Sequence, residues 1–175
     1  AKFFSPLAPS SVKRTPVLMT RVEYGFVGSY NKHKKSPFET FYVGGDGMSG
    51  YSGAYGTETI ALRGYENRSI AGSDGPETFG YAYSKLAMEL RYPFLLEPSS
   101  TIYGLVFLEA GNAWKDMKSF NPFDLKRSAG VGVRIFLPMI GLMGLDWGYG
   151  FDVPNYGGKG KRNGSKLSFV LGQEF

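Results

Sequence analysis

Six segments of this chain alternate strictly between apolar residues and polar or small ones, and this alternation constrains the fold more than any other feature. A period of two is the pattern of a β-strand whose two faces meet different surroundings. In the segment at 83–94, for example, Leu86 and Met88 alternate with Ala87 and Glu89. The alternating segments span 17–30, 83–94, 100–114, 127–138, 142–152 and 166–175, and residues 2–7 resemble the end of one more strand.

The second face of these segments carries charged residues and glycine, which differs from the inner face of a soluble β-sandwich. The segments are about as long as the 9–11 residues that a tilted strand needs to cross a bilayer, or slightly longer. A soluble sheet alternates too, with its polar face in water, so alternation by itself leaves both classes open.

The lengths of the connections separate these two classes. Tight turns at 93–100 and 138–141 alternate with longer loops at 31–81, 115–125 and 153–165. Bacterial outer-membrane barrels have the same asymmetry, with short periplasmic turns and long outer loops. Aromatic residues also gather near the strand ends, as in an interfacial girdle, at Tyr24, Tyr30, Trp114, Trp147, Tyr149 and Phe151. The sequence therefore predicts an all-β fold, an antiparallel transmembrane β-barrel.

The composition agrees with one domain of this kind in 175 residues. Its 25 glycines, 12 tyrosines and 14 phenylalanines favour β-structure over helix. A hydrophobic content of 42% with only 20% charged residues excludes a disordered chain. The sequence has no apolar run of about 20 residues that could form a transmembrane helix. It also lacks cysteine, which excludes disulfides and thiolate metal sites.

A series of motifs follows in order along the chain: FYVGG at 41–45, LRGY at 62–65, AMEL at 87–90, FLEAGNAW at 107–114, SAGVGVRIFLP at 128–138 and the closing KLSFVLGQEF. In this order and spacing they resemble the C-terminal half of the BamA-type outer-membrane protein assembly factors, in the superfamily of outer-membrane surface antigens. The insert GGDGMSGYSGAYG is similar to members from Bacteroidota.

This resemblance implies a sixteen-stranded barrel preceded by periplasmic POTRA domains. The chain would supply about the last six to seven strands, over residues 1–175, with 31–82 as a long extracellular loop that folds into the barrel lumen. POTRA-like sequence and the first strands are absent, and six strands are too few for a wide lumen. We therefore expect this chain to be part of a longer protein.

Arg63 lies in a glycine-rich loop, where an arginine ordinarily meets water. In the family that the chain resembles, the LRGY-type motif lies inside the lumen, which implies that Arg63 reaches Glu89 and Glu109 on the inner wall. Gly64 would allow close packing, and Tyr65 would anchor the loop. Both glutamates lie on the polar faces of their strands by alternation, and a guanidinium can bind carboxylates bidentately. The family more often has aspartate at the position of Glu109, which predicts a looser fit there.

The last segment is apolar at alternate positions and ends on phenylalanine. This pattern occurs in any apolar terminal strand, and it also resembles the signal that outer-membrane insertion machinery recognises. In the family, the last strand forms one side of a lateral gate against the first strand. The resemblance assigns this gate to Leu167, Phe169, Leu171, Gly172 and Phe175.

The function implied is that of an outer-membrane protein assembly and insertion factor without enzymatic activity. The edge of the last strand would pair with a strand of an incoming client through main-chain hydrogen bonds. Two alternatives stay open: a translocation pore of the two-partner-secretion type, and the barrel anchor of a surface lipase-like enzyme. The POTRA domains upstream would separate a pore from an insertion factor.

An enzymatic site within the chain is disfavoured by its residues. The single histidine, His33, lies among lysines in a loop, and no Gly-x-Ser-x-Gly motif is present. Glu89 and Glu109 could form an acid–base pair, but an ion pair with Arg63 explains them with fewer assumptions. We expect no cofactor and no metal.

The partners implied are unfolded outer-membrane β-barrel clients, accessory lipoproteins of the assembly complex, membrane lipid and lipopolysaccharide, in the outer membrane of a Gram-negative bacterium. The net charge of +5 includes basic loops that either contact lipopolysaccharide phosphates or are simply solvated, with Lys32, Lys34, Lys35, Lys159, Lys161 and Arg162. Nucleic acid is excluded as a partner, because no aromatic platform is interleaved with these cations.

Overall fold

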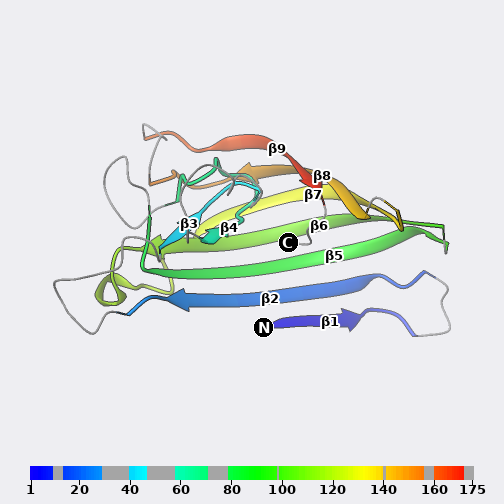
Figure 1. Ribbon diagram of the computed structural model, residues 1–175, viewed down its shortest axis with the longest axis horizontal. Coiled ribbons are helices and arrows are strands. Elements are labelled where there is room, and N and C mark those ends of the chain that lie inside the picture. The colour runs from blue at the N-terminus through cyan, green and yellow to red at the C-terminus, as the bar shows by residue number, and fades with distance from the viewer. Residues whose placement is uncertain are drawn as a thin grey trace.

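The computed structural model describes residues 1–9, 14–28, 40–46, 58–70, 79–97, 99–139, 141–155 and 160–171. Seven strands form one antiparallel sheet in the order β1-β2-β5-β6-β7-β8-β9 (Figure 1). They are β1 (Lys2–Pro6), β2 (Val17–Phe26), β5 (Ala82–Glu97), β6 (Ser100–Trp114), β7 (Lys126–Leu137), β8 (Gly141–Gly150) and β9 (Gly164–Leu171). Each strand is antiparallel to the next strand of the sheet, and the strands follow one another in the sheet in the same order as in the sequence, as in an up-and-down barrel.

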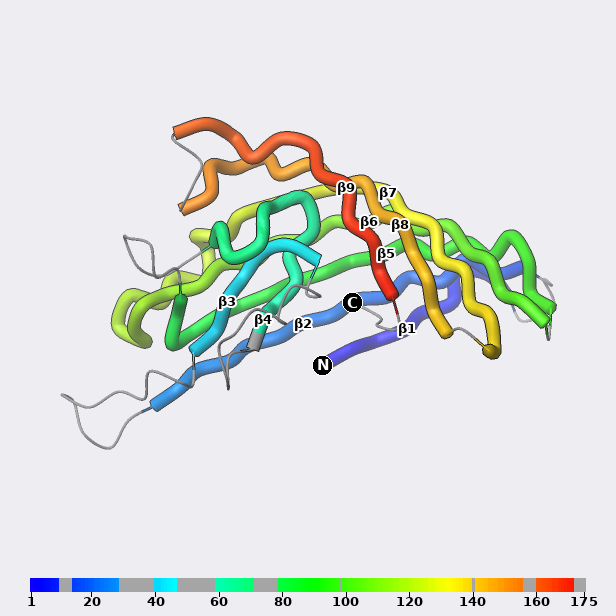
Figure 2. The backbone as a smooth tube through the Cα atoms, turned by 45° about the horizontal axis from the view of Figure 1, so that its top comes forward, coloured from blue at the N-terminus to red at the C-terminus, as the bar shows by residue number. Residues whose placement is uncertain are grey.

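The sheet curves into a trough, and two further strands lie on its concave side (Figures 1 and 2). These strands, β3 (Phe41–Val43) and β4 (Glu58–Ile60), pair in parallel. We predicted residues 31–81 as loop, and this is wrong for β3 and β4. Strands of three residues are too short to show alternation, so the sequence pattern could not reveal them.

Residues on the two faces of the sheet are distributed as the alternation predicted. On β5, Leu86 and Met88 are 36% and 45% exposed on the convex face, whereas Ala87 and Glu89 are buried on the concave face. Large apolar side chains on the outside and charged ones inside reverse the arrangement of a soluble protein. This arrangement suits a barrel wall whose convex face meets lipid, and the predicted fold class, an antiparallel β-barrel sheet, is confirmed.

At one end of the sheet the β5–β6 and β7–β8 turns are short, although the β1–β2 connection there covers residues 7–16; at the other end the connections are long. The turn between β5 and β6 is even shorter than predicted, because β5 continues through the predicted turn to Glu97. A β-bulge between Pro93 and Leu95 absorbs the proline, and Phe94 and Leu96 stay on the exposed face beyond it. At the other end, a 3₁₀ turn (Met117–Ser119) lies between β6 and β7.

A small apolar core joins the inner segment to the wall. Val43, Ile60, Leu62, Tyr65 and Ile70 pack against Tyr83 and Ala113 of β5 and β6. The segment at 58–70 therefore lies against the concave face, close to the end with long loops. Among the described residues, no helix is long and apolar enough to cross a membrane.

Strands β7 and β8 lie close to the ring of Phe107, and Gly130 makes this approach possible. A Cβ at Gly130 would lie 2.2 Å from the carbonyl oxygen of Trp147 and 2.4 Å from Cζ of Phe107. We expect Gly130→Ala to destabilise the full-length protein by about 1–3 kcal/mol through overpacking. The measurement is the temperature at which the folded, heat-modifiable gel band is lost. Gly28→Ala is the control, because a Cβ there meets nothing within 4 Å; equal melting of both variants would contradict the packing argument.

Candidate functional site

The side chain of Arg63 is 1% exposed and lies on the concave face of the sheet. The preceding residue, Leu62, donates its N–H to the carbonyl of Gly45 at 3.1 Å, and Tyr65 donates to the carbonyl of Leu62 at 3.4 Å. These bonds fold the LRGY segment into a turn. Gly64 occupies the left-handed region with φ of +85°, which is the conformation that turns the chain here.

Glu109 on β6 is the principal partner of Arg63. Its Oε2 accepts the backbone N–H of Arg63 at 2.8 Å, and its Oε1 accepts Nε at 3.0 Å and Nη2 at 2.8 Å. We predicted a looser fit at this glutamate, and that is wrong. The longer side chain reaches both the backbone and the guanidinium of Arg63 at once.

Two more carboxylates complete the set around the guanidinium. Nη2 donates to Oε1 of Glu89 on β5 at 2.5 Å, and Nη1 donates to Oδ2 of Asp146 on β8 at 3.3 Å. The guanidinium carbon also lies 3.7 Å from the ring centroid of Phe107. One arginine thus joins side chains from three strands of the wall. Burial alone would lower the pKa of Arg63, but the charges of Glu109 and Glu89 outweigh it and raise the pKa above its usual value.

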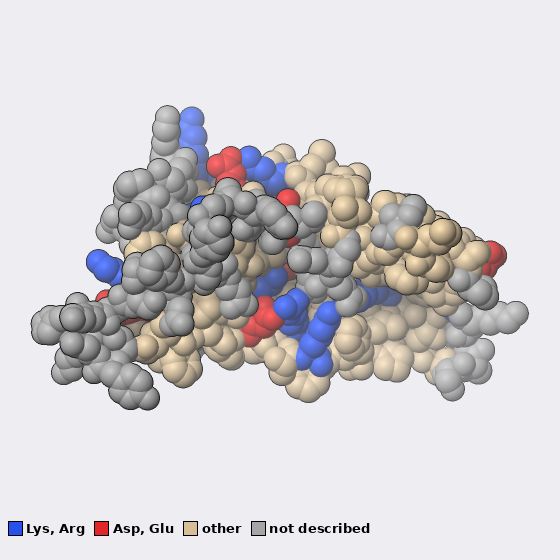
Figure 3. Space-filling view, in the orientation of Figure 1, with Lys and Arg blue, Asp and Glu red and all other residues tan. Residues whose placement is uncertain are grey.

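Each of these carboxylates also pairs with a cation of the wall itself. Glu89 pairs with Arg91 at 2.7 Å, Glu109 with Lys85 at 3.4 Å, and Asp146 accepts Nη1 and Nη2 of Arg134 at 2.6 and 2.7 Å. The three wall pairs sum to zero charge, and Arg63 adds one positive charge. Figure 3 shows Lys, Arg, Asp and Glu side chains grouped near the middle of this face.

Gly64 packs directly on the backbone of β8. A Cβ on Gly64 would lie 3.0 Å from the carbonyl carbon of Tyr149, and a Cβ on Gly148 would lie 2.9 Å from the nitrogen of Gly64. The carbonyl of Gly64 accepts a hydrogen bond from Nδ2 of Asn163 at 2.6 Å. Two backbones can approach this closely only where both lack side chains.

Tyr65 and Glu66 extend the contact to the last strands. The hydroxyl of Tyr65 donates to the carbonyl of Arg127 at 2.7 Å and accepts the N–H of Asp152 at 3.2 Å. Burial raises the pKa of Tyr65 to about 12. Glu66 pairs with Lys166 of β9 at 2.6 Å. LRGY and the following Glu66 together therefore contact every strand from β5 to β9.

The structure brings together Arg63, Glu89 and Glu109, which the sequence named as one set. Sequence analysis missed Asp146 and Arg134, although both stand on the polar faces of their segments. A further signal was the glycine opposite each: a Cβ on Gly132 would lie 1.8 Å from Oδ1 of Asp146. On the last strand, Leu167, Phe169 and Leu171 point outward and are 71%, 54% and 47% exposed. Gly172 and Phe175 lie outside the described residues.

Metal ligation finds no support at this site. Within the described ranges, no group of three or more His, Cys, Asp or Glu residues could hold a metal ion. The carboxylates around Arg63 are paired with cationic side chains, so the site binds the loop through ion pairs.

Loss of the charge on Glu109 should strongly destabilise the protein. Glu109→Gln leaves Arg63 and Lys85 buried with one carboxylate fewer, and breaking a buried pair costs about 3–5 kcal/mol. Glu23→Gln is the control, because the side chains of the Arg21–Glu23 pair are about a quarter exposed, so water compensates for part of the lost charge there and the expected destabilisation is smaller. Melting of the full-length protein is measured by gel mobility. Similar losses for both variants would show that the Arg63 site adds no special stability.

Substitution of Gly64 should release the loop from the wall. Gly64→Ala adds both left-handed strain of about 1–2 kcal/mol and a clash with β8. Gly160→Ala shares a positive φ, at +73°, but its Cβ meets nothing within 4 Å. Protease cleavage of the loop in the folded full-length protein should therefore be faster in Gly64→Ala than in Gly160→Ala. Equal cleavage in both variants would mean that the close approach to β8 does not hold the loop.

Comparison with known proteins gives the chain a family. No curated protein matches it. The profile of the Omp85 superfamily domain matches residues 1–175, which is the whole chain. Members of this superfamily are outer-membrane proteins, and in general they insert proteins into the membrane or translocate them across it. The sheet with its apolar convex face and polar concave face is part of such a barrel, and the chain belongs to the Omp85 superfamily.

Proposed function

We propose that this chain is the C-terminal part of a BamA-like factor that inserts unfolded β-barrel proteins into the outer membrane of a Gram-negative bacterium. The observation that carries the proposal is the burial of Arg63 among three carboxylates of the wall. A loop that is fixed inside a barrel by three buried ion pairs has a functional role there, because a loop that only connects two strands would lie at the surface. POTRA domains upstream, and accessory lipoproteins bound to them, would deliver the clients.

Insertion would take place at the edge of β9. Within the described residues, β9 pairs with β8 and lies at the end of the sheet. An edge strand offers free N–H and C=O groups, so an incoming client strand can pair with it by β-augmentation. Leu167, Phe169 and Leu171 already point outward, in the direction expected of a strand beside lipid. Gly172 and Phe175 would continue the same seam.

The loop would couple the lumen to this seam. Lys166 of β9 pairs with Glu66, and Asn163 just before β9 donates to Gly64, so two bonds link the last strand to the loop. Arg63 fixes the same loop to β5, β6 and β8. A shift of β9 during insertion would therefore pull on a loop that is also anchored to β5, β6 and β8.

The wall could release this loop without exposing unpaired charge. Each carboxylate keeps a cation of its own when Arg63 leaves, at Arg91, Lys85 and Arg134. Removing one member of an isolated buried pair would cost several kcal/mol, whereas here the remaining pairs stay neutral. The loop is thus a reversible latch rather than a permanent plug.

The test uses the full-length protein in lipid vesicles with an unfolded β-barrel client, whose folding is followed by heat-modifiable gel mobility. Wild type should accelerate client folding over empty vesicles. Arg63→Ala should reduce that acceleration by about tenfold, which corresponds to about 1.4 kcal/mol in the barrier. Lys118→Ala is the matched control, because Lys118 is an exposed cation in the 3₁₀ turn and should leave the rate unchanged.

The possible outcomes separate the function from the latch. Client folding no faster than in empty vesicles would overturn the insertion factor and favour a translocation pore of the same superfamily. Acceleration that survives Arg63→Ala would keep the function and reject the role of the latch.

A further inference from the structure

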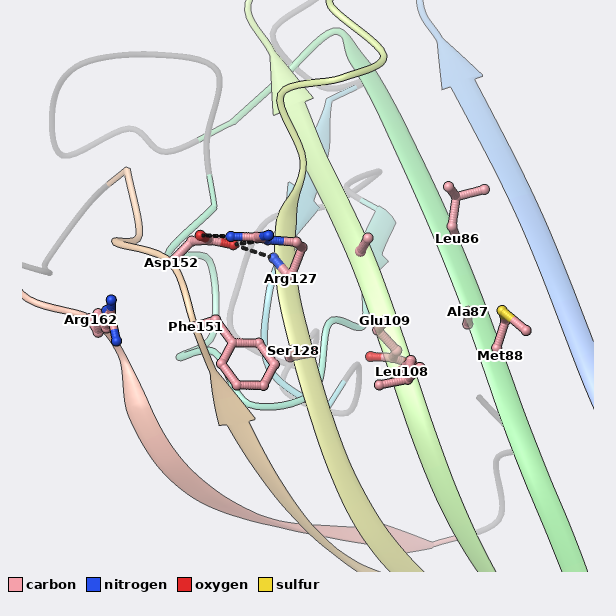
Figure 4. Close-up of a pocket in the computed structure, with 11 residues that line it drawn as sticks. Leu86, Ala87, Met88, Leu108, Glu109, Arg127, Ser128, Phe151, Asp152 and Arg162 are labelled. Atoms are coloured by element: carbon pink, nitrogen blue, oxygen red, sulfur yellow. Dashed lines mark hydrogen bonds and ion pairs between the residues drawn. The ribbon is translucent and has the colours of Figure 1, made fainter.

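A hollow of about 640 Å³ lies along β5, β6 and β7. The exposed side chains of Leu86, Met88 and Leu108 line it on the convex face, and the buried residue Glu109 of the Arg63 site also contributes to its lining. Figure 4 shows Leu86, Met88 and Leu108 toward one side of this hollow, and Arg127 and Arg162 toward the other. Arg127 stands at the start of β7, and Arg162 stands two residues before β9. Both arginines are therefore at the end of the sheet that carries the long loops.

A small side chain creates the depression in this outward row. The register places Ala110 between Leu86 on β5 and Arg127 on β7. Because Ala110 rises less than its neighbours, the surface dips between them. Leu108, two residues before Ala110 on the same outward face of β6, is 57% exposed beside the depression. In an outer-membrane barrel, this apolar surface meets the acyl region of the bilayer.

The charges at the rim are arranged to receive an anion. Arg127 is exposed and donates from Nε and Nη2 to Asp152, at 3.1 and 2.9 Å, so its Nη1 stays available within the described structure. Arg162 is exposed and forms no hydrogen bond or ion pair with the residues that the structure describes. Arg127, Arg162 and Asp152 sum to a charge of +1, and Asp152 fixes the guanidinium of Arg127 at the rim. Glu109 also lines the hollow, but its carboxylate is paired with Arg63 and Lys85.

We propose that this hollow binds an outer-leaflet lipid that carries a phosphate monoester and several acyl chains. The phosphate would pair with Arg127 and Arg162 in charge-assisted hydrogen bonds, since guanidinium groups match phosphate geometry. The acyl chains would lie over Ala110 and along Leu86, Met88 and Leu108. A zwitterionic lipid has no net charge for the rim, so it would occupy the site weakly. This inference requires an outer-membrane barrel but neither insertion nor translocation activity.

The experiment measures lipid binding to the full-length protein in phosphatidylcholine nanodiscs doped with diphosphoryl lipid A, by native mass spectrometry after release. Wild type should retain diphosphoryl lipid A over phosphatidylcholine. Arg127→Gln with Arg162→Gln should weaken that retention by about tenfold, the loss expected for charge-assisted contacts to phosphate. Ala110→Trp should weaken it too, because the indole fills the dip without changing the charge.

Lys118→Gln is the control for general electrostatics, since Lys118 is a cation at the same end of the sheet that does not line the hollow. It should leave retention unchanged. Heat-modifiable mobility confirms that each variant is folded. Retention that is unaffected by the arginine pair, or lost equally in Lys118→Gln, would overturn the site. Equal retention of phosphatidylcholine by wild type would overturn it as well.

Discussion

The burial of one guanidinium, that of Arg63, is the interaction on which the inner side of this sheet depends. A charge taken out of water is stable only where carboxylates and hydrogen bonds replace its hydration. Three strands supply those carboxylates, at Glu89, Glu109 and Asp146. The loop therefore needs the curved wall to hold it, and the wall gains a crosslink between strands that are not all neighbours.

The same alternation places apolar side chains on the outward face of the sheet and polar side chains on its inward face. Outward side chains such as Met88 and Leu145 exclude polar atoms from the lipid side, while the strands satisfy their backbone groups in the ladder. Inward positions do not face lipid, so they need not be apolar and can carry ion pairs and glycine. The separation explains how a chain with only 20% charged residues concentrates charge on one surface.

Much of this architecture could be predicted because each strand repeats one simple rule. Alternation identified six of the seven strands of the sheet and placed Glu89 and Glu109 on its inner face. The LRGY resemblance, not the alternation, joined them to Arg63. Short strands could not be predicted from alternation. β3 and β4 have three residues each, and residues far apart in the sequence bring them together. Asp146 was also missed, because alternation alone does not tell a carboxylate that meets a distant loop from one that meets only its neighbour.

The glycines of β8 have a consequence for the energetics of the docked loop. Where Gly64 meets Gly148 and Gly150, both surfaces are bare main chain. Docking there restricts no side-chain rotamer on either side, so this part of the contact carries no side-chain entropy cost. The side chains of β8 at this contact need no repacking when the loop docks, so the fit depends on the path of the two main chains alone.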